Sequence, residues 1–201
     1  MCVSVVIIKN IFCFDFFAHS ACLCMAELEL GRVLGRGGFC VVNEISGINL
    51  DDSIIEGPKP EMRDYQTREA MSTRCMRGGE ARYAIKMLSE DCKKVPALFL
   101  KGTIDLAIEA RFLAVMNHPH LVKMRAVANV NAFNDGYFIV LDRLYDTLET
   151  RVRKWKSALK KTKGIRGSLS GGKKKATEVI LEKIGTAHDI SSAMVYMHSL
   201  K

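Results

Sequence analysis

The stretch L-G-R-G-G-F-C-V-V, residues 34–42, decides how the first half of this chain folds. Alternating apolar and β-branched residues surround it from Leu28 to Ser46, and this pattern predicts two strands joined by a glycine turn. Such a turn lets backbone N–H groups approach phosphate oxygens, although glycines also form ordinary hairpins. A strand follows the glycines rather than a helix, and no Gly-Lys-Ser/Thr follows them, which argues against Rossmann and Walker phosphate loops.

A lysine inside the third predicted strand is the second informative feature. Lys86 lies in the run Y-A-I-K-M-L, and a buried ammonium group needs a counter-charge. Glu109 is a candidate partner, because it lies in a predicted helix, Asp105–Met116. We expect Ile108 and Phe112 to be buried, which places Glu109 at the border of the apolar face. The alternatives are a strand-edge lysine with its ammonium in water and an ordinary solvated glutamate.

The remaining elements complete an α+β pattern. Pro119 ends the helix, because proline cannot continue it. Five strands with one helix after the third, followed by further helices, predict a small antiparallel sheet at the start of the domain. A parallel dinucleotide-binding sheet does not fit this order. The other predicted elements are strands at Arg82–Leu88, Leu121–Val130 and Tyr137–Leu141, and helices at Leu144–Leu159 and Glu178–Leu200.

Taken together, these segments resemble the eukaryotic-type protein kinase family of the Ser/Thr kind. The glycine stretch resembles the kinase G-x-G-x-x-G-x-V loop, and Tyr83–Lys86 resembles V-A-I-K. Glu109 stands nine residues before H-P-H-L-V, much as the glutamate of kinase helix αC precedes H-P-N-I-V. Tyr137–Leu144 is similar to the fifth strand and hinge, and Ala193–Lys201 to the end of helix αE. The resemblance covers Leu28–Lys201, with two insertions.

The resemblance implies a kinase small lobe, a five-stranded antiparallel sheet with helix αC, followed by helices αD and αE of the large lobe. It also implies the ATP-binding portion of a serine/threonine kinase, whose full-length parent would transfer the γ-phosphate of ATP to protein hydroxyls. Lys86 would contact the phosphates and pair with Glu109, as the catalytic ion pair. The expected ATP contacts are Leu34, Gly35, Gly37, Gly38, Val42, Ala84, Lys86, Leu141 as gatekeeper, Asp142 and Leu144.

Two departures from the family pattern matter. Cys40 replaces the third loop glycine, and no H-R-D, D-F-G or A-P-E motif is present. The catalytic aspartate and the Mg²⁺ ligands are therefore missing, so we expect these 201 residues alone to be inactive, with Mg²⁺ bound only in a full-length parent. A fragment or a truncated gene model is the expected origin, rather than a natural half-kinase. The alternative function is a pseudokinase or regulatory interaction fragment without catalysis.

The net charge of +8 comes from one segment. Residues 151–175 hold eleven Lys/Arg and no Asp/Glu, so the rest of the chain holds 30 − 11 = 19 basic against 22 acidic residues. The segment is either a patch that attracts phosphate or acidic partners, or a solvated, flexible insertion. We expect a possible acidic partner there, but no specific nucleic acid and no membrane.

The domain organisation follows from these segments. Residues 1–25 are an apolar extension expected outside the domain; the alternatives are a strand or helix packed on the domain, a weak targeting segment, or an upstream stretch mistakenly read as coding. Residues 26–144 are the small lobe and hinge, and 145–201 an incomplete large lobe with the basic insertion 151–175. Residues 47–80 are polar and contain Pro and Gly, which predicts a long, poorly ordered loop. Seven irregularly spaced cysteines indicate reduced thiols in a cytoplasmic protein. The two histidines of His118-Pro119-His120 are expected in a turn rather than at a metal, since no third ligand is near.

Overall fold

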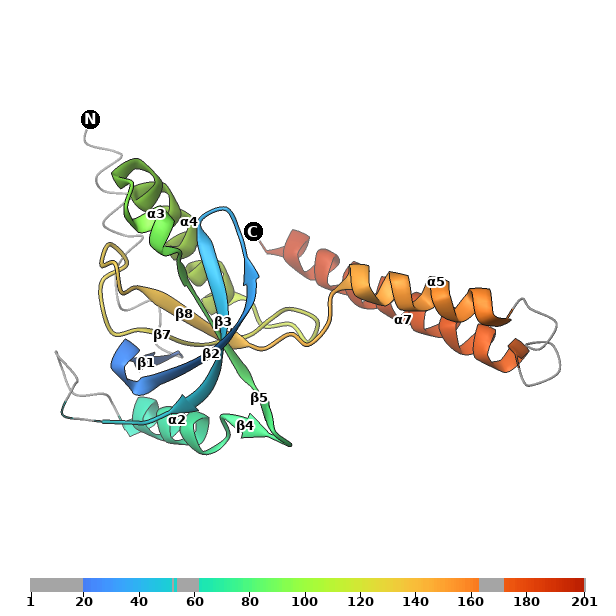
Figure 1. Cartoon of the computed structure of the whole chain (residues 1–201), viewed down its shortest axis with the longest axis horizontal. Coiled ribbons are helices and arrows are strands. Elements are labelled where there is room, and N and C mark those ends of the chain that lie inside the picture. The colour runs from blue at the N-terminus through green and yellow to red at the C-terminus, as the bar shows by residue number, and fades with distance from the viewer. Residues whose placement is uncertain (1–19, 52, 54–61, 163–171, 201) are drawn as a thin grey trace. The chain divides into compact units, whose positions relative to one another are not determined.

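The computed structural model describes residues 20–51, 53, 62–162 and 172–200, which form an α+β structure (Figure 1). These residues divide into two compact units. The first contains the described residues up to Asn117 together with Val122–Arg143. The second contains His118–Leu121 and the chain from Leu144 onward. The predicted α+β class is confirmed.

A six-stranded mixed sheet forms the first unit, in the order β1-β7-β8-β6-β3-β2. Five of the strands are antiparallel to their neighbours, and β1 joins the edge in parallel with β7. The five predicted strands are therefore present, but the expected purely antiparallel sheet is wrong because a sixth strand extends it. The strands are β1 (Ala21–Leu23), β2 (Leu28–Arg36), β3 (Cys40–Ile48), β6 (Tyr83–Leu88), β7 (Met124–Ala128) and β8 (Phe138–Asp142).

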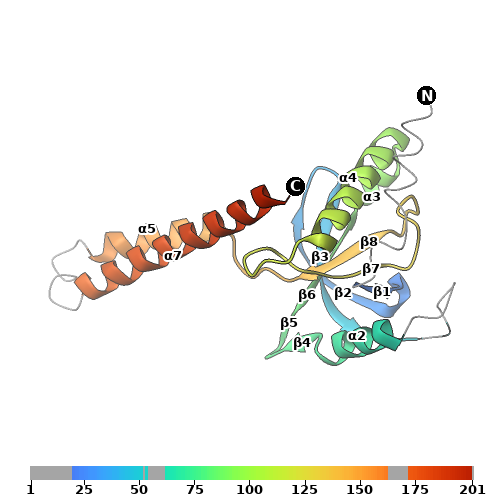
Figure 2. The ribbon, with the colours of Figure 1, turned by 180° about the vertical axis from the view of Figure 1, so that it is seen from behind.

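The core lies between this sheet and helix α4 (Pro96–Val115), which packs against β6 and β7 (Figure 2). Pro96 suits the first helical position, where its missing N–H leaves no hydrogen bond unmade. A short helix, α3 (Glu90–Lys93), precedes α4, and Ser89 caps it by accepting a hydrogen bond from the Cys92 N–H. Fully buried side chains of the core include Ile45, Ile85, Leu106, Val127, Phe138, Ile139 and Val140.

The buried face of α4 differs from the expected one. Leu106, Ala107 and Ala110 face the core at helical spacing. Ile108 and Phe112, which we expected to be buried, are 38 % and 60 % exposed. A helix with apolar residues all round leaves the choice of buried face to its tertiary contacts, which the sequence pattern alone does not reveal.

The region expected to be a poorly ordered loop, 47–80, contains a helix and two short strands among its described residues. It contains helix α2 (Met62–Thr73) and a small hairpin of β4 (Met76–Arg77) and β5 (Glu80–Ala81). The hairpin turns at Gly78 and Gly79, whose positive φ angles of 59° and 81° suit residues without a Cβ. Residues 52 and 54–61 of the expected loop lie outside the described residues.

Helix α2 is held by a buried ion pair rather than by a broad apolar face. Arg68 pairs with Glu27, and both side chains are almost completely buried. Glu27 also accepts hydrogen bonds from the backbone N–H groups of Cys24 and Asp51. Buried Met71 and Cys75 continue the contact at helical spacing from Arg68. Residues 68, 71 and 75 are spaced as on one face of a helix. This pattern is hard to recognise in the sequence because the region is mostly polar.

The boundary expected at residue 25 lies too far along the chain. Ala21 and Leu23 are buried in β1, in register with Ala126 and Ala128 of β7. The Cys22 N–H donates to the Asp64 carboxylate of α2, so this strand joins the sheet to the insertion. Residues 1–19 of the expected extension lie outside the described residues.

The second unit is a pair of packed helices, α5 (Leu148–Thr162) and α7 (Gly172–Ser199). Trp155 of α5 and Val179 of α7 are buried, and the Lys183 ammonium lies 5.9 Å from the centre of the Trp155 ring. Both predicted helices are present with shifted limits. The interpretation of 151–175 as a flexible insertion is wrong for its described residues, because they lie on α5 and α7.

Two further findings concern all described residues. None of their helices combines the length and the apolar character needed to cross a membrane. Their cysteines, Cys22, Cys24, Cys40, Cys75 and Cys92, are all free thiols.

The buried Arg68–Glu27 pair yields a stability prediction. Arg68→Ala leaves the Glu27 carboxylate buried and without its counter-ion, and we expect a loss of about 3–5 kcal/mol in the free energy of unfolding. Urea denaturation followed by circular dichroism measures it. The control is Lys94→Ala, which removes an exposed ion pair with Asp91 and is expected to change stability by less than about 1 kcal/mol. Equal effects of the two substitutions would contradict the role of the buried pair.

Candidate functional site

A cavity of about 480 Å³ opens within the first unit, a size typical of small-molecule sites. Three elements meet around it: the β2–β3 hairpin with the glycine stretch, the end of β6, and one face of α4. Opposite charges line it, with cationic side chains from the hairpin and β6 and carboxylates from α4. The lining residues are Gly35, Arg36, Gly37, Gly38, Phe39, Cys40, Val42, Lys86, Asp105, Leu106 and Glu109.

The glycine hairpin closes with a two-residue loop. Arg36 pairs with Val41 in the ladder, and the Gly37 N–H donates to the Cys40 carbonyl at 2.8 Å. The Gly37 N–H is therefore engaged in the turn and not available to a ligand. The N–H groups of Gly38 and Phe39 at the tip form no hydrogen bond with other described residues.

Neither backbone strain nor internal packing demands glycine in this loop. The φ angles of Gly35, Gly37 and Gly38 are not positive. A Cβ built at Gly35 or Gly38 meets no atom within 4 Å, and one at Gly37 meets only the Cys40 carbonyl oxygen at 3.7 Å. The absence of side chains thus leaves open space beside the cavity, where a bound molecule can approach the tip N–H groups.

Lys86 and Glu109 form an ion pair in the wall of this cavity. The Lys86 Nζ lies 2.5 Å from the Glu109 Oε2, with side chains 23 % and 38 % exposed. Lys86 belongs to a central strand, between β3 and β8. Glu109 comes from α4, one turn after Asp105, which lines the same cavity. The pair fixes the ammonium group at a defined position while part of its surface stays open to the cavity.

Six of the sequence-predicted site residues meet in this cavity. Gly35, Gly37, Gly38, Val42, Lys86 and Glu109 line it. The strand register explains part of this, because Val42 is directly opposite Lys86.

The other predicted ATP contacts, which are Leu34, Ala84, Leu141, Asp142 and Leu144, do not line the cavity. Ala84 is buried in β6, opposite Leu141 of β8, which is only partly buried. Leu34 and Asp142 also lie outside the lining set. Leu144 belongs to the second unit, and its side chain is 71 % exposed. The structure therefore brings together the predicted loop glycines, Val42 and the Lys86–Glu109 pair, but not the remaining predicted ATP contacts.

Sequence reasoning missed several lining residues. Arg36, Phe39 and Leu106 were not assigned a role, and neither was Asp105. The available signal for Asp105 was its position four residues before Glu109, which places both carboxylates on one side of the helix. For Arg36 the signal was its place between two loop glycines.

Cys40 stands where the third loop glycine is missing, and it lines the cavity. Its side chain is partly buried. Burial raises the pKa of the Cys40 thiol above its ordinary value. The neighbouring Lys86 ammonium opposes this by lowering the pKa, and the Glu109 carboxylate raises it further. At neutral pH the group is therefore a neutral thiol and a weak nucleophile.

Gly102 of α4 positions the hairpin tip. A Cβ at this glycine would lie 2.9 Å from Leu88 Cδ2, 3.0 Å from Phe39 Cβ and 3.1 Å from Cys92 Sγ. Only glycine permits so close an approach of the helix to the hairpin. The Lys101 ammonium also lies 5.4 Å from the centre of the Phe39 ring.

The end of β8 is fixed by two ion pairs. The Asp142 carboxylate accepts two hydrogen bonds from the Arg125 guanidinium, both at 2.7 Å. The hydrogen bond to Asp142 raises the pKa of Arg125 above its ordinary value. The next residue, Arg143, pairs with Glu44 at 3.0 Å, and its N–H donates to the Arg82 carbonyl. The backbone at Asp142 and Arg143 is therefore held in place by β3, β6 and β7.

The two histidines of the H-P-H turn make contacts within the second unit instead of forming a metal site. The His118 ring stacks on Tyr196 at 5.1 Å and lies in hydrogen-bonding distance of Ser192. His120 lies 3.4 Å from the Asp189 carboxylate. Among the described residues, no three His, Cys, Asp or Glu side chains are grouped to hold a metal ion.

Comparisons with known proteins add no family assignment. No model of a known protein family matches this chain, and no curated protein sequence is significantly similar to it.

The contact at Gly102 yields a second prediction. Gly102→Val forces side-chain atoms against Phe39, Leu88 and Cys92, and overpacking of this kind is expected to cost about 1–3 kcal/mol of unfolding free energy. Thermal and urea denaturation measure it. The matched control is Gly185→Val in α7, where a Cβ meets no atom within 4 Å, so its effect should stay within about 0.5 kcal/mol. A neutral Gly102→Val variant would show that the hairpin is not held by this contact.

Proposed function

We propose that this chain is the ATP-binding portion of a serine/threonine protein kinase, whose full-length parent transfers the γ-phosphate of ATP to protein hydroxyl groups. The Lys86–Glu109 ion pair carries the proposal, because it lies in the wall of the cavity that the glycine hairpin also lines. The five antiparallel strands with α4 packed against them support it as well, since they agree with the small lobe that the sequence motifs imply.

The chemistry of the cavity suits the phosphate groups of ATP. The Lys86 ammonium would contact the α- and β-phosphates while Glu109 holds it in place. The N–H groups of Gly38 and Phe39 would donate to phosphate oxygens, as backbone N–H groups of glycine loops do elsewhere. Arg36 lines the same cavity and would add a second positive charge. The two hydrogen bonds from Arg125 to the Asp142 carboxylate would hold this residue in place, and the Asp142 backbone would hydrogen-bond the edge of the adenine ring.

Phosphoryl transfer needs groups that the 201 residues do not contain. The described carboxylates of the cavity, Asp105 and Glu109, do not suit Mg²⁺, since Glu109 is committed to Lys86 and no third ligand accompanies them. The sequence contains no H-R-D or D-F-G motif. Catalysis is therefore proposed only for a longer parent that supplies a catalytic aspartate and metal ligands.

A non-catalytic alternative draws on two observations in the hairpin. The Gly37 N–H is already bonded within the hairpin, and Cys40 replaces the third glycine. A loop with fewer available donors suits a pseudokinase that binds nucleotide weakly and acts through partner contacts. The two functions share the nucleotide site and differ in whether the parent transfers phosphate.

Replacing Lys86 tests the shared site. Lys86→Met removes the ammonium but keeps most of the side-chain length, and we expect binding of a fluorescent ATP analogue to weaken about tenfold or more, in line with the loss of a charge-assisted contact. Fluorescence titration measures the dissociation constant. Lys94→Met, at an exposed lysine of the same unit outside the cavity, is the control and should bind like the unmodified chain.

The same pair of variants separates the proposed function from its alternative. In a longer product of the gene, Lys86→Met should abolish kinase activity and Lys94→Met should preserve it. A parent without kinase activity whose nucleotide binding still depends on Lys86 would support the pseudokinase. Nucleotide binding that is unaffected by Lys86→Met would contradict both.

A further inference from the structure

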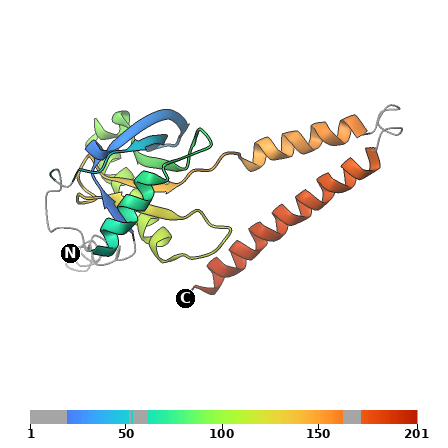
Figure 3. The ribbon, with the colours of Figure 1, turned by 90° about the horizontal axis from the view of Figure 1, so that it is seen from below.

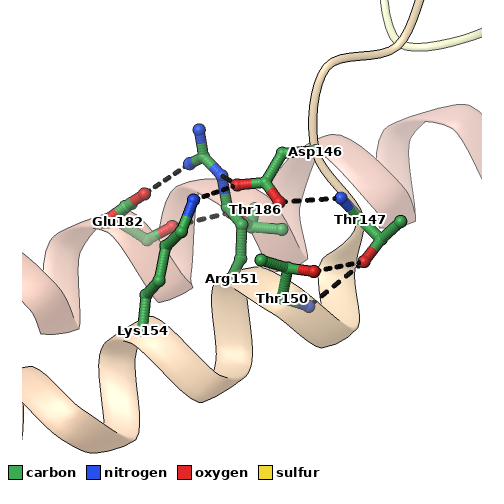
Figure 4. A network of polar contacts seen from close by, with 7 residues as sticks. All are labelled: Asp146, Thr147, Thr150, Arg151, Lys154, Glu182 and Thr186. Atoms are coloured by element: carbon green, nitrogen blue, oxygen red, sulfur yellow. Dashed lines mark hydrogen bonds and ion pairs between the residues drawn. The ribbon is translucent and has the colours of Figure 1, made fainter. Parts of the chain in front are cut away.

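Figure 4 shows how carboxylates of this chain are commonly neutralised. Asp146 pairs with Lys154 at 2.8 Å, and Glu182 pairs with Arg151. Asp105 of α4 differs from them, because its carboxylate forms no ion pair and no hydrogen bond with any described residue. It lies in the middle of α4, far from the first turn, where the helix dipole stabilises an acidic residue. The fold therefore makes no use of this carboxylate.

Asp105 lines the cavity between the two groups that are proposed to hold phosphate, the Lys86 ammonium and the N–H groups of the hairpin tip. One turn further along α4, Glu109 pairs with Lys86. One turn back, Gly102 approaches the hairpin so closely that a Cβ there would lie 3.0 Å from the Phe39 Cβ. Figure 3 shows the blue hairpin next to the green helices. The order Gly102, Asp105, Glu109 on one side of the helix thus follows the cavity from the tip to the ammonium group.

The charge of Asp105 is felt on another wall of the cavity. Cys40 belongs to β3 and lines the same cavity. Burial is the main cause of the raised pKa of its thiol, and the carboxylates of Glu109 and Asp105 raise this pKa further, whereas the Lys86 ammonium lowers it. An anionic group bound beside Cys40 would therefore also experience the negative charge of Asp105.

We propose that Asp105 is a specificity-determining residue of the nucleotide site, which weakens the binding of ATP relative to ADP. The inference rests on the proposed function, in which Lys86 contacts the α- and β-phosphates. The γ-phosphate then extends from Lys86 toward the hairpin tip and passes Asp105, and like charges repel. ADP has no phosphate at this position. The Asp105 carboxylate therefore opposes ATP more than ADP.

Arg36 has the opposite effect from the hairpin. Its guanidinium lines the same cavity, has no ion-pair partner among the described residues, and attracts phosphate. The balance of Arg36, Lys86 and Asp105 sets the affinity for each nucleotide, but of these three only Asp105 disfavours an added phosphate. Substituting Asp105 alone therefore isolates its share of the discrimination between the two nucleotides.

Nucleotide titrations of the full 201-residue chain test the proposal. The probes are the N-methylanthraniloyl derivatives of ATP and ADP, followed by fluorescence in a low-salt buffer with EDTA, where the phosphates keep their full charge. We expect Asp105→Asn to tighten binding of the ATP probe about threefold to tenfold, because it removes a repulsive charge, and binding of the ADP probe less than about twofold. Asp105→Glu retains the charge and should retain the ratio of the two dissociation constants.

The matched control is Asp135→Asn, which removes an exposed carboxylate of the first unit outside the cavity and should leave both dissociation constants unchanged. The gain in Asp105→Asn should largely disappear at about 0.5 M KCl, since salt screens exposed charges. Equal tightening for both probes, weaker binding of the ATP probe, or the same gain in Asp135→Asn would overturn the proposal.

The titrations also distinguish this inference from the function on which it rests. If Lys86→Met weakens binding of both probes while Asp105→Asn leaves their ratio unchanged, the assignment of Asp105 is wrong and the nucleotide site stands. If the unmodified chain binds neither probe, both are overturned.

Discussion

A lysine in the central strand of a sheet must find a counter-charge, and the first unit is arranged around the solution to this requirement. Lys86 cannot move without disturbing β6, whose neighbours on both sides are fixed by ladder hydrogen bonds. Glu109 meets Lys86 from α4, and the pair agrees with the rotation of α4 about its axis. Leu106, Ala107 and Ala110 then face the core, and Ile108 and Phe112 face away from it. The same rotation of α4 thus buries these core residues and brings Glu109 to the cavity, where the ion pair places opposite charges in the wall.

The hairpin and the insertion depend on other close contacts. Gly102 lets α4 approach Phe39, so the hairpin tip is held near the same helix that carries Glu109. On the opposite side of the unit, the buried Arg68–Glu27 pair attaches α2 to the connection between the end of β1 and the start of β2. The contact at Gly102 fixes two walls of the cavity, the hairpin and α4, relative to each other. The tip N–H groups of the glycine loop remain without partners among the described residues. An anionic ligand would supply the hydrogen-bond acceptors that these N–H groups lack.

The sequence predicts the elements whose local signal and tertiary role agree. The two strands beside the glycines and the strand with Lys86 follow from the alternation of apolar residues. The pairing of Lys86 with Glu109 is predicted from the need of a strand lysine for a counter-charge, although the helix face expected to be buried, with Ile108 and Phe112, is wrong. The elements missed are those stabilised by tertiary contacts alone. Helix α2 looks like a loop because its main buried side chain is Arg68, and β1 is too short for alternation to be visible. The cavity lining beyond the motifs, such as Asp105, depends on how α4 is rotated.

The most direct test of the account is protection of Cys40 by nucleotide. The thiol lines the cavity, and its raised pKa makes labelling slow at neutral pH and faster as the pH rises toward that pKa. Maleimide labelling followed by peptide mass spectrometry, with Cys24 outside the cavity as the internal reference, should show that ATP slows the labelling of Cys40 severalfold and leaves Cys24 unchanged. Equal labelling of Cys40 with and without saturating ATP would contradict a nucleotide site between the glycine hairpin and the Lys86–Glu109 pair.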